Sequence, residues 1–332
     1  MADTAAPRQL DGHLLSLAGL SADTLRSLLT DAREFADATE PPPSLAGRTV
    51  ALLFLEDSTR TRSSFRLAAE RLGARAVDLT GVGSSVSKGE SLIDTARTIE
   101  AMGIDAMAVR TKEACGPAVV AEGSACPVIN AGDGRHEHPT QGLLDALTLA
   151  RALGRDRDFD LTGLRIAVVG DLGASRVFRS DVSIFTALGA EVIAVGPTAL
   201  APGSLERLGC RVERDLDAVI PEIDAVQMLR VQFERHGGTA IASRRQYRGR
   251  FGLTRERGRA MKDGAVVMHP GPMNRGLEID HEVAEGGPDL PRPLILEQVT
   301  NGVFVRMAVL NTLVNGPLVA NTKPAGTANL AP

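Results

Sequence analysis

Three hydroxyl side chains and a guanidinium stand together where an apolar segment gives way to a helical pattern. The apolar segment Thr49–Leu55 is followed by Ser58-Thr59-Arg60-Thr61-Arg62, and a helix is predicted over Ser63–Leu72 with Gly73 as its C-cap. A strand-to-helix turn offers free backbone N–H groups and the positive end of a helix dipole, and an arginine adds a planar fork of donors. This cluster therefore predicts a phosphate site, with hydroxyl capping beside a solvated Arg60 as the alternative.

A Gly/Ser-rich segment farther along the chain carries a lone ammonium group. The stretch Thr80–Ser91 contains Ser84 and Lys88, and Lys88 is one of only four lysines in the chain. A mobile loop that delivers this ammonium and a solvated surface charge both fit the pattern. The nearest approach to a Walker loop has Ser87 where a glycine precedes the lysine, which disfavours nucleoside triphosphate binding.

Two histidines lie in a polar stretch between a strand-like and a helical segment. His138 precedes Pro139, which suits a first helical turn, so His138 and Gln141 are predicted to line one edge of a cleft. His136 and His138 have the spacing of a metal-binding pair, but no third ligand or carboxylate at suitable spacing is evident. We therefore predict a hydrogen-bonding His138 and no metal.

Two arginines follow strand-like segments in the second half of the chain. Arg176 comes after Arg165–Val169, and Arg230 comes after Ala225–Leu229. The carboxyl ends of parallel strands meet at one sheet edge, so both guanidiniums are expected at the edge where ligands bind. The turn after the first of these strands lacks the G-x-G-x-x-G pattern, and no nicotinamide cofactor is predicted.

Another strand-like segment, Ala265–Met268, ends in His269-Pro270-Gly271-Pro272-Met273-Asn274-Arg275-Gly276. This stretch predicts a rigid turn with few donors and exposed carbonyl groups. A turn with only a structural role explains it equally well.

The elements that must position these residues alternate along the chain. An amphipathic helix is predicted over Ser21–Ala38, and short apolar runs then alternate with helical stretches in both halves. This pattern predicts an α/β fold of two domains, each a parallel sheet flanked by helices. The predicted limits are 1–150 for the first domain and 151–296 for the second, with a flexible tail over 317–332. The pattern of the terminal helix, about 297–316, would let it dock on either domain, and we expect it to pack back on the first.

Composition excludes several classes of protein. The chain has 332 residues with 37 basic and 41 acidic side chains, a net charge of −4, and only ten aromatic residues. A net negative charge and few aromatic side chains disfavour nucleic-acid binding. It has no apolar run of about 18 residues, so no membrane span is predicted. The three cysteines have no C-x-x-C spacing, which favours a reducing cytoplasm over a disulfide framework.

Taken in order, the polar motifs resemble those of the catalytic chains of aspartate carbamoyltransferases. The matching stretches are STRTR at 58–62, SSVSKGES at 84–91, HPTQ at 138–141, GDLGASR at 170–176, RVQ at 230–232 and HPGPMNRG at 269–276. An ornithine enzyme would be expected to show HPCQ and HCLP at the third and sixth of these places. The resemblance, over about residues 45–310, therefore implies the aspartate branch of the carbamoyltransferase family.

The resemblance also implies roles by position. It places the carbamoyl phosphate site on Ser58, Thr59, Arg60, Thr61, Ser84, Lys88, Arg110, His138 and Gln141. It places the aspartate site on Lys88, Arg176, Arg230, Gln232, Gly271 and Pro272. The groups expected to act in catalysis are His138, Arg60, Thr61, Lys88 and Arg110, with hydrogen bonds that stabilise the oxyanion and no covalent enzyme intermediate.

The family further implies an assembly and a place in metabolism. It implies an early step of pyrimidine biosynthesis without cofactor, carried out by a homotrimer in which Ser84 and Lys88 reach into a neighbour's site. A separate regulatory chain or a neighbouring enzyme of the same biosynthesis stays open as a partner. Two other functions also stay open, namely transfer to a different amine and a silent paralogue that serves as a scaffold. Phe233 and the stretch His236–Ala242 match no motif.

Overall fold

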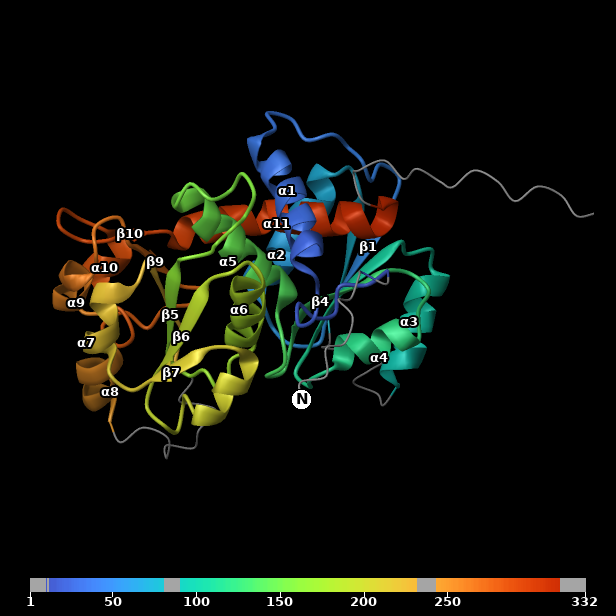
Figure 1. Cartoon of the computed structure of the whole chain (residues 1–332). Helices are drawn as coiled ribbons and strands as arrows, with labels where there is room; N and C mark the ends of the chain where they lie inside the picture. The colour runs from blue at the N-terminus through green and yellow to red at the C-terminus, as the bar shows by residue number, and fades with distance from the viewer. Residues whose placement is uncertain (1–9, 11, 81–89, 232–242, 317–332) are drawn as a thin grey trace, which may run out of the picture.

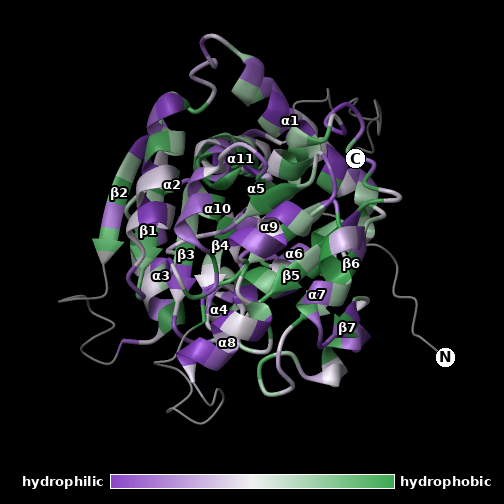
Figure 2. Cartoon of the chain, turned by 90° about the vertical axis from the view of Figure 1, so that its left-hand side faces the viewer, coloured by the Kyte–Doolittle hydropathy of each residue, from purple (hydrophilic) through white to green (hydrophobic). Residues whose placement is uncertain are grey.

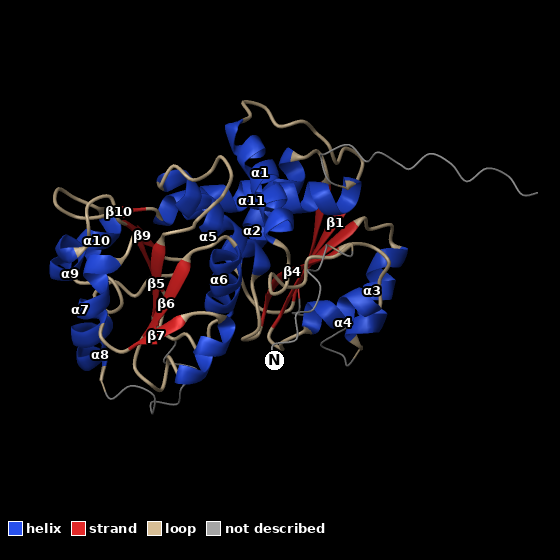
Figure 3. Ribbon diagram, viewed as in Figure 1, coloured by secondary structure: helices blue, strands red, loops and turns tan. Residues whose placement is uncertain are grey.

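Two parallel β-sheets, each with helices on both faces, make up the protein (Figure 1, Figure 3). The computed structural model describes residues 10, 12–80, 90–231 and 243–316. The first sheet has the strand order β2-β1-β3-β4, with β1 Thr49–Phe54, β2 Arg75–Thr80, β3 Ala106–Thr111 and β4 Val128–Asp133. The second has the order β10-β9-β8-β5-β6-β7, with β5 Arg165–Val169, β6 Glu191–Val195, β7 Arg211–Glu213, β8 Ala225–Met228, β9 Val266–Met268 and β10 Arg292–Pro293.

Helices connect successive strands of each sheet. Around the first sheet they are α1 Ala22–Asp37, α2 Thr59–Arg71, α3 Leu92–Ala101, α4 Gly116–Glu122 and α5 Pro139–Ala152. Around the second sheet they are α6 Arg176–Ala187, α7 Leu216–Val219, α8 Arg244–Phe251, α9 Arg255–Ala260 and α10 His281–Glu285, and α11 Ile295–Asn315 ends the described chain. The predicted fold class, two helix-flanked parallel sheets, is confirmed.

Successive apolar side chains along a strand lie on opposite faces of the sheet, which explains why both faces are covered by helices. In β1, Val50 and Leu52 join the core that contains α1, α2 and α11, whereas Ala51 and Leu53 join the core that contains α3 and α4. All of these side chains are buried, as expected for parallel strands packed on both sides. Figure 2 shows the same arrangement as apolar strands inside a more polar shell of helices.

The last helix ties the two halves together. Helix α11 extends from the side of the second sheet to the first and packs against α1, α2 and α5 (Figure 1). Most of the buried apolar residues of α11, from Val303 to Leu310, and those of α5 belong to a single core that also includes one face of each sheet. The return of the terminal helix to the first domain is therefore confirmed. No helix among the described residues combines the length and apolarity needed to cross a membrane.

Helix boundaries differ from the prediction at one functionally important point. Helix α2 begins at Thr59, four residues before the predicted Ser63, so the hydroxyl-rich segment forms its first turn. The backbone can coil this early because Ser58 is extended and serves as N-cap. At the other end Gly73 has φ +79°, the left-handed conformation that the predicted C-cap requires. The domain limits 1–150 and 151–296 stay a prediction, and the predicted tail 317–332 lies outside the described residues.

Candidate active site

A cavity of about 610 Å³ opens where the carboxyl ends of strands from both sheets face each other. The first sheet contributes the residues after β1, the end of β3 and the start of α5. The second sheet contributes the turns after β5, β8 and β9, and α11 closes one side. Segments remote in sequence thus meet because parallel strands direct all of these ends toward one edge.

The start of α2 forms the first wall of the cavity. Ser58, Thr59, Arg60 and Thr61 all line it, and the Ser58 hydroxyl makes no capping hydrogen bond to the helix. The first N–H groups of a helix lack partners within the helix, so they can bind an anion together with these hydroxyls. Arg60 is exposed on this wall, whereas Thr61 is buried.

A carboxylate holds two cavity arginines together. Glu56 Oε2 lies 3.0 Å from Arg110 Nε and 2.8 Å from Arg176 Nη1, although Arg110 lies on β3 of the first sheet and Arg176 begins α6, beside the second. Both guanidiniums also lie against Gly132, where a Cβ would come within 2.8 Å of Arg110 Nη1. Arg110 is fixed further by a 3.1 Å hydrogen bond to the Ala131 carbonyl. The absence of a side chain at Gly132 is what allows the two guanidiniums to converge.

His138 is a buried, neutral imidazole at the start of α5. Burial, reinforced by the positive charges of Arg110, Arg306 and Arg176, holds the pKa of His138 well below its ordinary value. Its Nε2 lies 3.4 Å from Thr61 Oγ1, and its Nδ1 is buried without a hydrogen-bond partner among the described residues. A neutral ring can donate one hydrogen bond into the cavity without competing for a proton at neutral pH.

Gln141 is held by a buried network behind the cavity. Its Nε2 donates to Asp145 Oδ1 at 3.0 Å, and Asp145 also accepts from Gln298 at 2.6 Å and from Gln227 at 2.8 Å. Burial raises the pKa of Asp145 to about 6, while burial and the Asp145 charge raise that of Asp181. These side chains come from α5, α6, β8 and α11, so the network connects both halves of the protein to a cavity residue.

The turn after β9 meets the start of α2 across the cavity. A Cβ at Gly271, which has φ +66°, would lie 3.5 Å from Arg60 Cζ. Gly271 and Pro272 both line the cavity, and the Gly271 N–H donates to His269 Nδ1 at 2.8 Å. His269 is buried beside Glu278, and burial lowers its pKa. The buried His269 therefore fixes the turn, while Gly271 and Pro272 stay accessible from the cavity.

The balance of charge in the cavity is positive. Its lining includes the guanidiniums of Arg60, Arg110, Arg176, Arg230 and Arg306 and the carboxylates of Glu56, Asp57 and Asp171. Arg306 lies on α11 with its guanidinium 5.1 Å from the Phe65 ring centroid, and burial lowers its pKa to about 9, so it remains charged at neutral pH. Five cations against three anions suit small molecules that bring several negative charges.

Comparison with known proteins assigns the chain to a family. The profile of the aspartate/ornithine carbamoyltransferase carbamoyl-P binding domain matches residues 12–151, and that of the Asp/Orn binding domain matches residues 162–313. The chain belongs to the aspartate/ornithine carbamoyltransferase family. It is 49% identical over 323 residues to the aspartate carbamoyltransferase catalytic subunit of Streptomyces coelicolor, covering 94% of this chain and 98% of that one. It is 51% identical over 311 residues to the catalytic subunit of Salinispora arenicola, covering 92% and 98%.

Solved structures of both branches of the carbamoyltransferase family share the fold. Aspartate transcarbamoylase from Trypanosoma cruzi, in complex with carbamoyl phosphate and aspartate, matches with a TM-score of 0.80 and 31% identity, covering 93% of this chain and 99% of that one. Ornithine carbamoyltransferase from Thermus thermophilus also reaches 0.80, with 27% identity over 92% and 100% of the two chains. The backbone fold alone therefore does not distinguish an aspartate from an ornithine carbamoyltransferase. The two relatives at about 50% identity are both named as aspartate carbamoyltransferase catalytic subunits.

The structure brings together most of the residues predicted for this carbamoyltransferase site. The cavity is lined by Ser58, Thr59, Arg60, Thr61, Arg110, His138, Gln141, Arg176, Arg230, Gly271 and Pro272. Ser84, Lys88 and Gln232 lie outside the described residues, as do Phe233 and the whole unassigned stretch 236–242. The roles given to these residues stay predictions.

Several cavity residues were not predicted from the sequence, and Glu56, Gln298 and Arg306 are the most notable. Glu56 stands directly before the hydroxyl cluster, but nothing in its position indicated that it would pair with two arginines. Arg306 and Gln298 interrupt the apolar pattern of α11 and are 3% and 2% exposed. A charged or amide side chain on the buried stripe of an amphipathic helix was the available signal, since such groups are rarely buried without a partner.

Proposed function

We propose that this chain transfers the carbamoyl group of carbamoyl phosphate to L-aspartate, giving N-carbamoyl-L-aspartate and phosphate in an early step of pyrimidine biosynthesis. The observation that carries the proposal is the shared cavity, which has an anion-binding helix start on one sheet and two arginines at the carboxyl edge of the other. Its excess of positive charge fits two substrates that together bring nearly four negative charges. The names of the catalytic subunits that resemble the chain at about half identity agree with this assignment.

The phosphate of carbamoyl phosphate binds at the start of α2. Backbone N–H groups and the hydroxyls of Ser58, Thr59 and Thr61 donate to its oxygens, while Arg60 supplies charge. Arg110 lies between this wall and His138 and bridges the phosphate and carbamoyl ends. Ser84 and Lys88 complete the site, by resemblance to the family.

His138 and Gln141 hold the carbamoyl group. The neutral imidazole donates to the carbonyl oxygen, together with Thr61 and Arg110, and these donors stabilise the oxyanion that forms when the amine attacks the carbonyl carbon. The new C–N bond forms as the bond to the phosphate oxygen breaks, and the departing phosphate accepts the amine proton. No covalent enzyme intermediate is required.

Aspartate binds on the opposite wall. Arg176 and Arg230, with Gln232 and Lys88, pair with its two carboxylates, and the carbonyls of Gly271 and Pro272 orient its amine toward the carbamoyl carbon. The proximity of Gly271 to Arg60, whose Cζ would lie 3.5 Å from a Cβ at that glycine, supports this placement, because it brings the acceptor turn within reach of the phosphate wall.

Substitutions on the two cavity walls test whether one wall binds carbamoyl phosphate and the other binds aspartate. Arg230→Ala is expected to raise the KM for aspartate far more than that for carbamoyl phosphate, with a loss of roughly 2 to 4 kcal/mol in kcat/KM. Arg60→Ala is expected to show the reverse preference in initial-rate kinetics. Exposed Arg207→Ala, on the same domain as Arg230, is the matched control. Equal effects of Arg230→Ala on both KM values would contradict the assignment.

We further propose a cytoplasmic homotrimer with shared sites. The Gly/Ser-rich sequence of 80–91 supports a segment that leaves its own domain, and Lys88 would then act beside a neighbour's Arg60 and His138. Lys88→Ala and His138→Ala chains should each be nearly inactive alone. Unfolded together and reassembled, they should regain a fraction of the activity, because some interfaces then pair two intact residues. Verified mixed trimers without recovery would exclude shared sites.

A further inference from the structure

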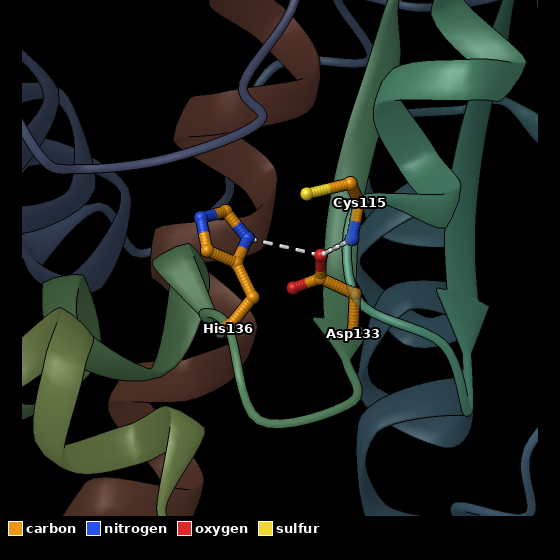
Figure 4. Close-up of side chains that lie close together, drawn as sticks. All are labelled: Cys115, Asp133 and His136. Atoms are coloured by element: carbon orange, nitrogen blue, oxygen red, sulfur yellow. Dashed lines mark hydrogen bonds and ion pairs between the residues drawn. The ribbon is translucent and has the colours of Figure 1, made fainter.

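A cluster of three metal-ligand side chains lies beside the active-site cavity but outside its lining. Cys115, Asp133 and His136 place a sulfur, a carboxylate oxygen and a ring nitrogen within 4.8 Å of one another. Figure 4 shows the three groups around a common space. Cys115 is the N-cap of α4, Asp133 ends β4 and His136 belongs to the turn before α5, so the cluster exists only in the folded chain.

Three donors that are not ligand atoms fix the central carboxylate, and the His136 ring contacts it as well. Asp133 is 1% exposed, and its Oδ1 accepts from Asn130 Nδ2 at 2.8 Å and from the Glu137 N–H at 3.0 Å. Its Oδ2 accepts from the Cys115 N–H at 2.6 Å and lies 3.0 Å from His136 Nδ1. The group is thus an oriented carboxylate, as second-shell hydrogen bonds provide at metal sites.

The donor set selects the chemical class of ion. Thiolate, imidazole and carboxylate together are ligands of Zn²⁺ and similar borderline divalent cations, whereas Mg²⁺ and Ca²⁺ prefer oxygen alone. Tetrahedral zinc needs ligand atoms roughly 3.3 to 3.6 Å apart, as follows from its bond lengths of about 2.0 to 2.3 Å. The Nδ1–Oδ2 separation is 3.0 Å, and the exposed Cys115 side chain can turn about its Cα–Cβ bond to close the remaining distance.

We propose that Cys115, Asp133 and His136 form a binding site for a zinc-class divalent cation, with solvent as the fourth ligand. The bound ion would join the start of α4 to the turn between β4 and α5, the turn that leads to His138. A hydrogen-bonded cluster that only shapes this turn is the alternative. The sequence alone did not predict this site, because the ligands beside His136 come from Cys115, 21 residues away, and from the end of the preceding strand rather than from His138.

Cobalt titration distinguishes a metal-binding site from a hydrogen-bonded cluster that only shapes the turn. The chelator-treated, reduced protein is titrated with Co²⁺ and then with Zn²⁺ while the absorption spectrum is followed. One Co²⁺ per chain should give a thiolate-to-cobalt charge-transfer band and tetrahedral ligand-field bands, which Zn²⁺ should remove. Zn²⁺ should also raise the melting temperature, because an ion that binds only the folded chain stabilises it.

Variants assign the band to the cluster. Cys115→Ser should abolish the charge-transfer band, and His136→Ala should weaken cobalt binding at least about 100-fold. Cys126→Ser and His281→Ala change a cysteine and a histidine outside the cluster and should leave the spectrum unchanged. Melting curves of the metal-free variants confirm that each is folded. A wild-type protein without the charge-transfer band, or a band that persists in Cys115→Ser, would overturn the proposal.

Discussion

Glu56 pairs with two arginines of the site and is expected to compete there with a bound anion, and Glu56→Gln tests this stand-in role directly. The Glu56 carboxylate lies within 3.0 Å of Arg110 and 2.8 Å of Arg176, and all three side chains are mostly buried. Each pair is worth about 4 kcal/mol at an effective dielectric of about 20 and a charge separation of about 4 Å. Desolvation offsets part of this, and glutamine keeps one acceptor, so we expect a loss of roughly 2 to 4 kcal/mol in the free energy of unfolding.

The same change should strengthen anion binding. A phosphate dianion about 6 Å from the Glu56 carboxylate is disfavoured by roughly 5 kcal/mol at a dielectric of about 20. Water and counter-ions screen most of this repulsion, which leaves roughly 1 to 2 kcal/mol, or about 5- to 30-fold in affinity. The two effects of Glu56→Gln therefore have opposite signs.

Two assays on the same variant measure these effects. Chemical unfolding in phosphate-free buffer gives the stability, and isothermal titration with inorganic phosphate gives the affinity. Glu70→Gln is the matched control, because Glu70 pairs with Arg66 at 2.9 Å on the exposed face of α2, away from the cavity. Unchanged stability together with unchanged or weaker phosphate binding in Glu56→Gln would refute the stand-in role.

Two further outcomes are expected. The pKa of Asp145 in the folded chain is raised to about 6 from 3.8, so its protonated form favours folding, and its contribution to stability should fall by on the order of 2 to 3 kcal/mol as pH rises from about 4 to 6. In urea unfolding, Asp181→Asn, a change within the Asp145 network, should lessen this loss of stability. Asp31→Asn removes a carboxyl with a pKa of about 6 elsewhere in the fold, and so reports the part of the pH dependence that does not come from the Asp145 network. Arg306→Met should weaken phosphate binding at least about tenfold, as measured by titration. The melting temperature should stay nearly unchanged, because a well-packed apolar side chain often replaces a buried charge at little cost. Unchanged phosphate affinity would show that Arg306 is not part of the site.

The sequence predicted those parts of the fold whose signals are local. Apolar runs gave the main strands within a few residues, and Ser21 caps α1 through the Thr24 N–H as expected. The short edge strands β7 and β10 were missed, because segments of three and two residues carry no periodicity. The start of α2 was placed too late, since serine and threonine are weak helix formers whereas the extended Ser58 sets the boundary.

The candidate site was predicted where motif and strand end coincide. His138, Arg176 and Arg230 follow recognisable segments, and the parallel topology then brings them to one edge. Glu56 was missed because its role depends on the convergence of arginines from two sheets. The Asp145 network and the Cys115 cluster were missed for the same reason, since each joins side chains from elements that become neighbours only in the tertiary structure.

Acceptor specificity tests the central claim most directly. Purified protein is given carbamoyl phosphate with L-aspartate or L-ornithine, and the carbamoylated product is measured. We predict turnover with L-aspartate and essentially none with L-ornithine, because a site with two arginines for carboxylates leaves one cation facing the ornithine ammonium. Comparable turnover with L-ornithine, or no turnover with either amine, would contradict the assignment.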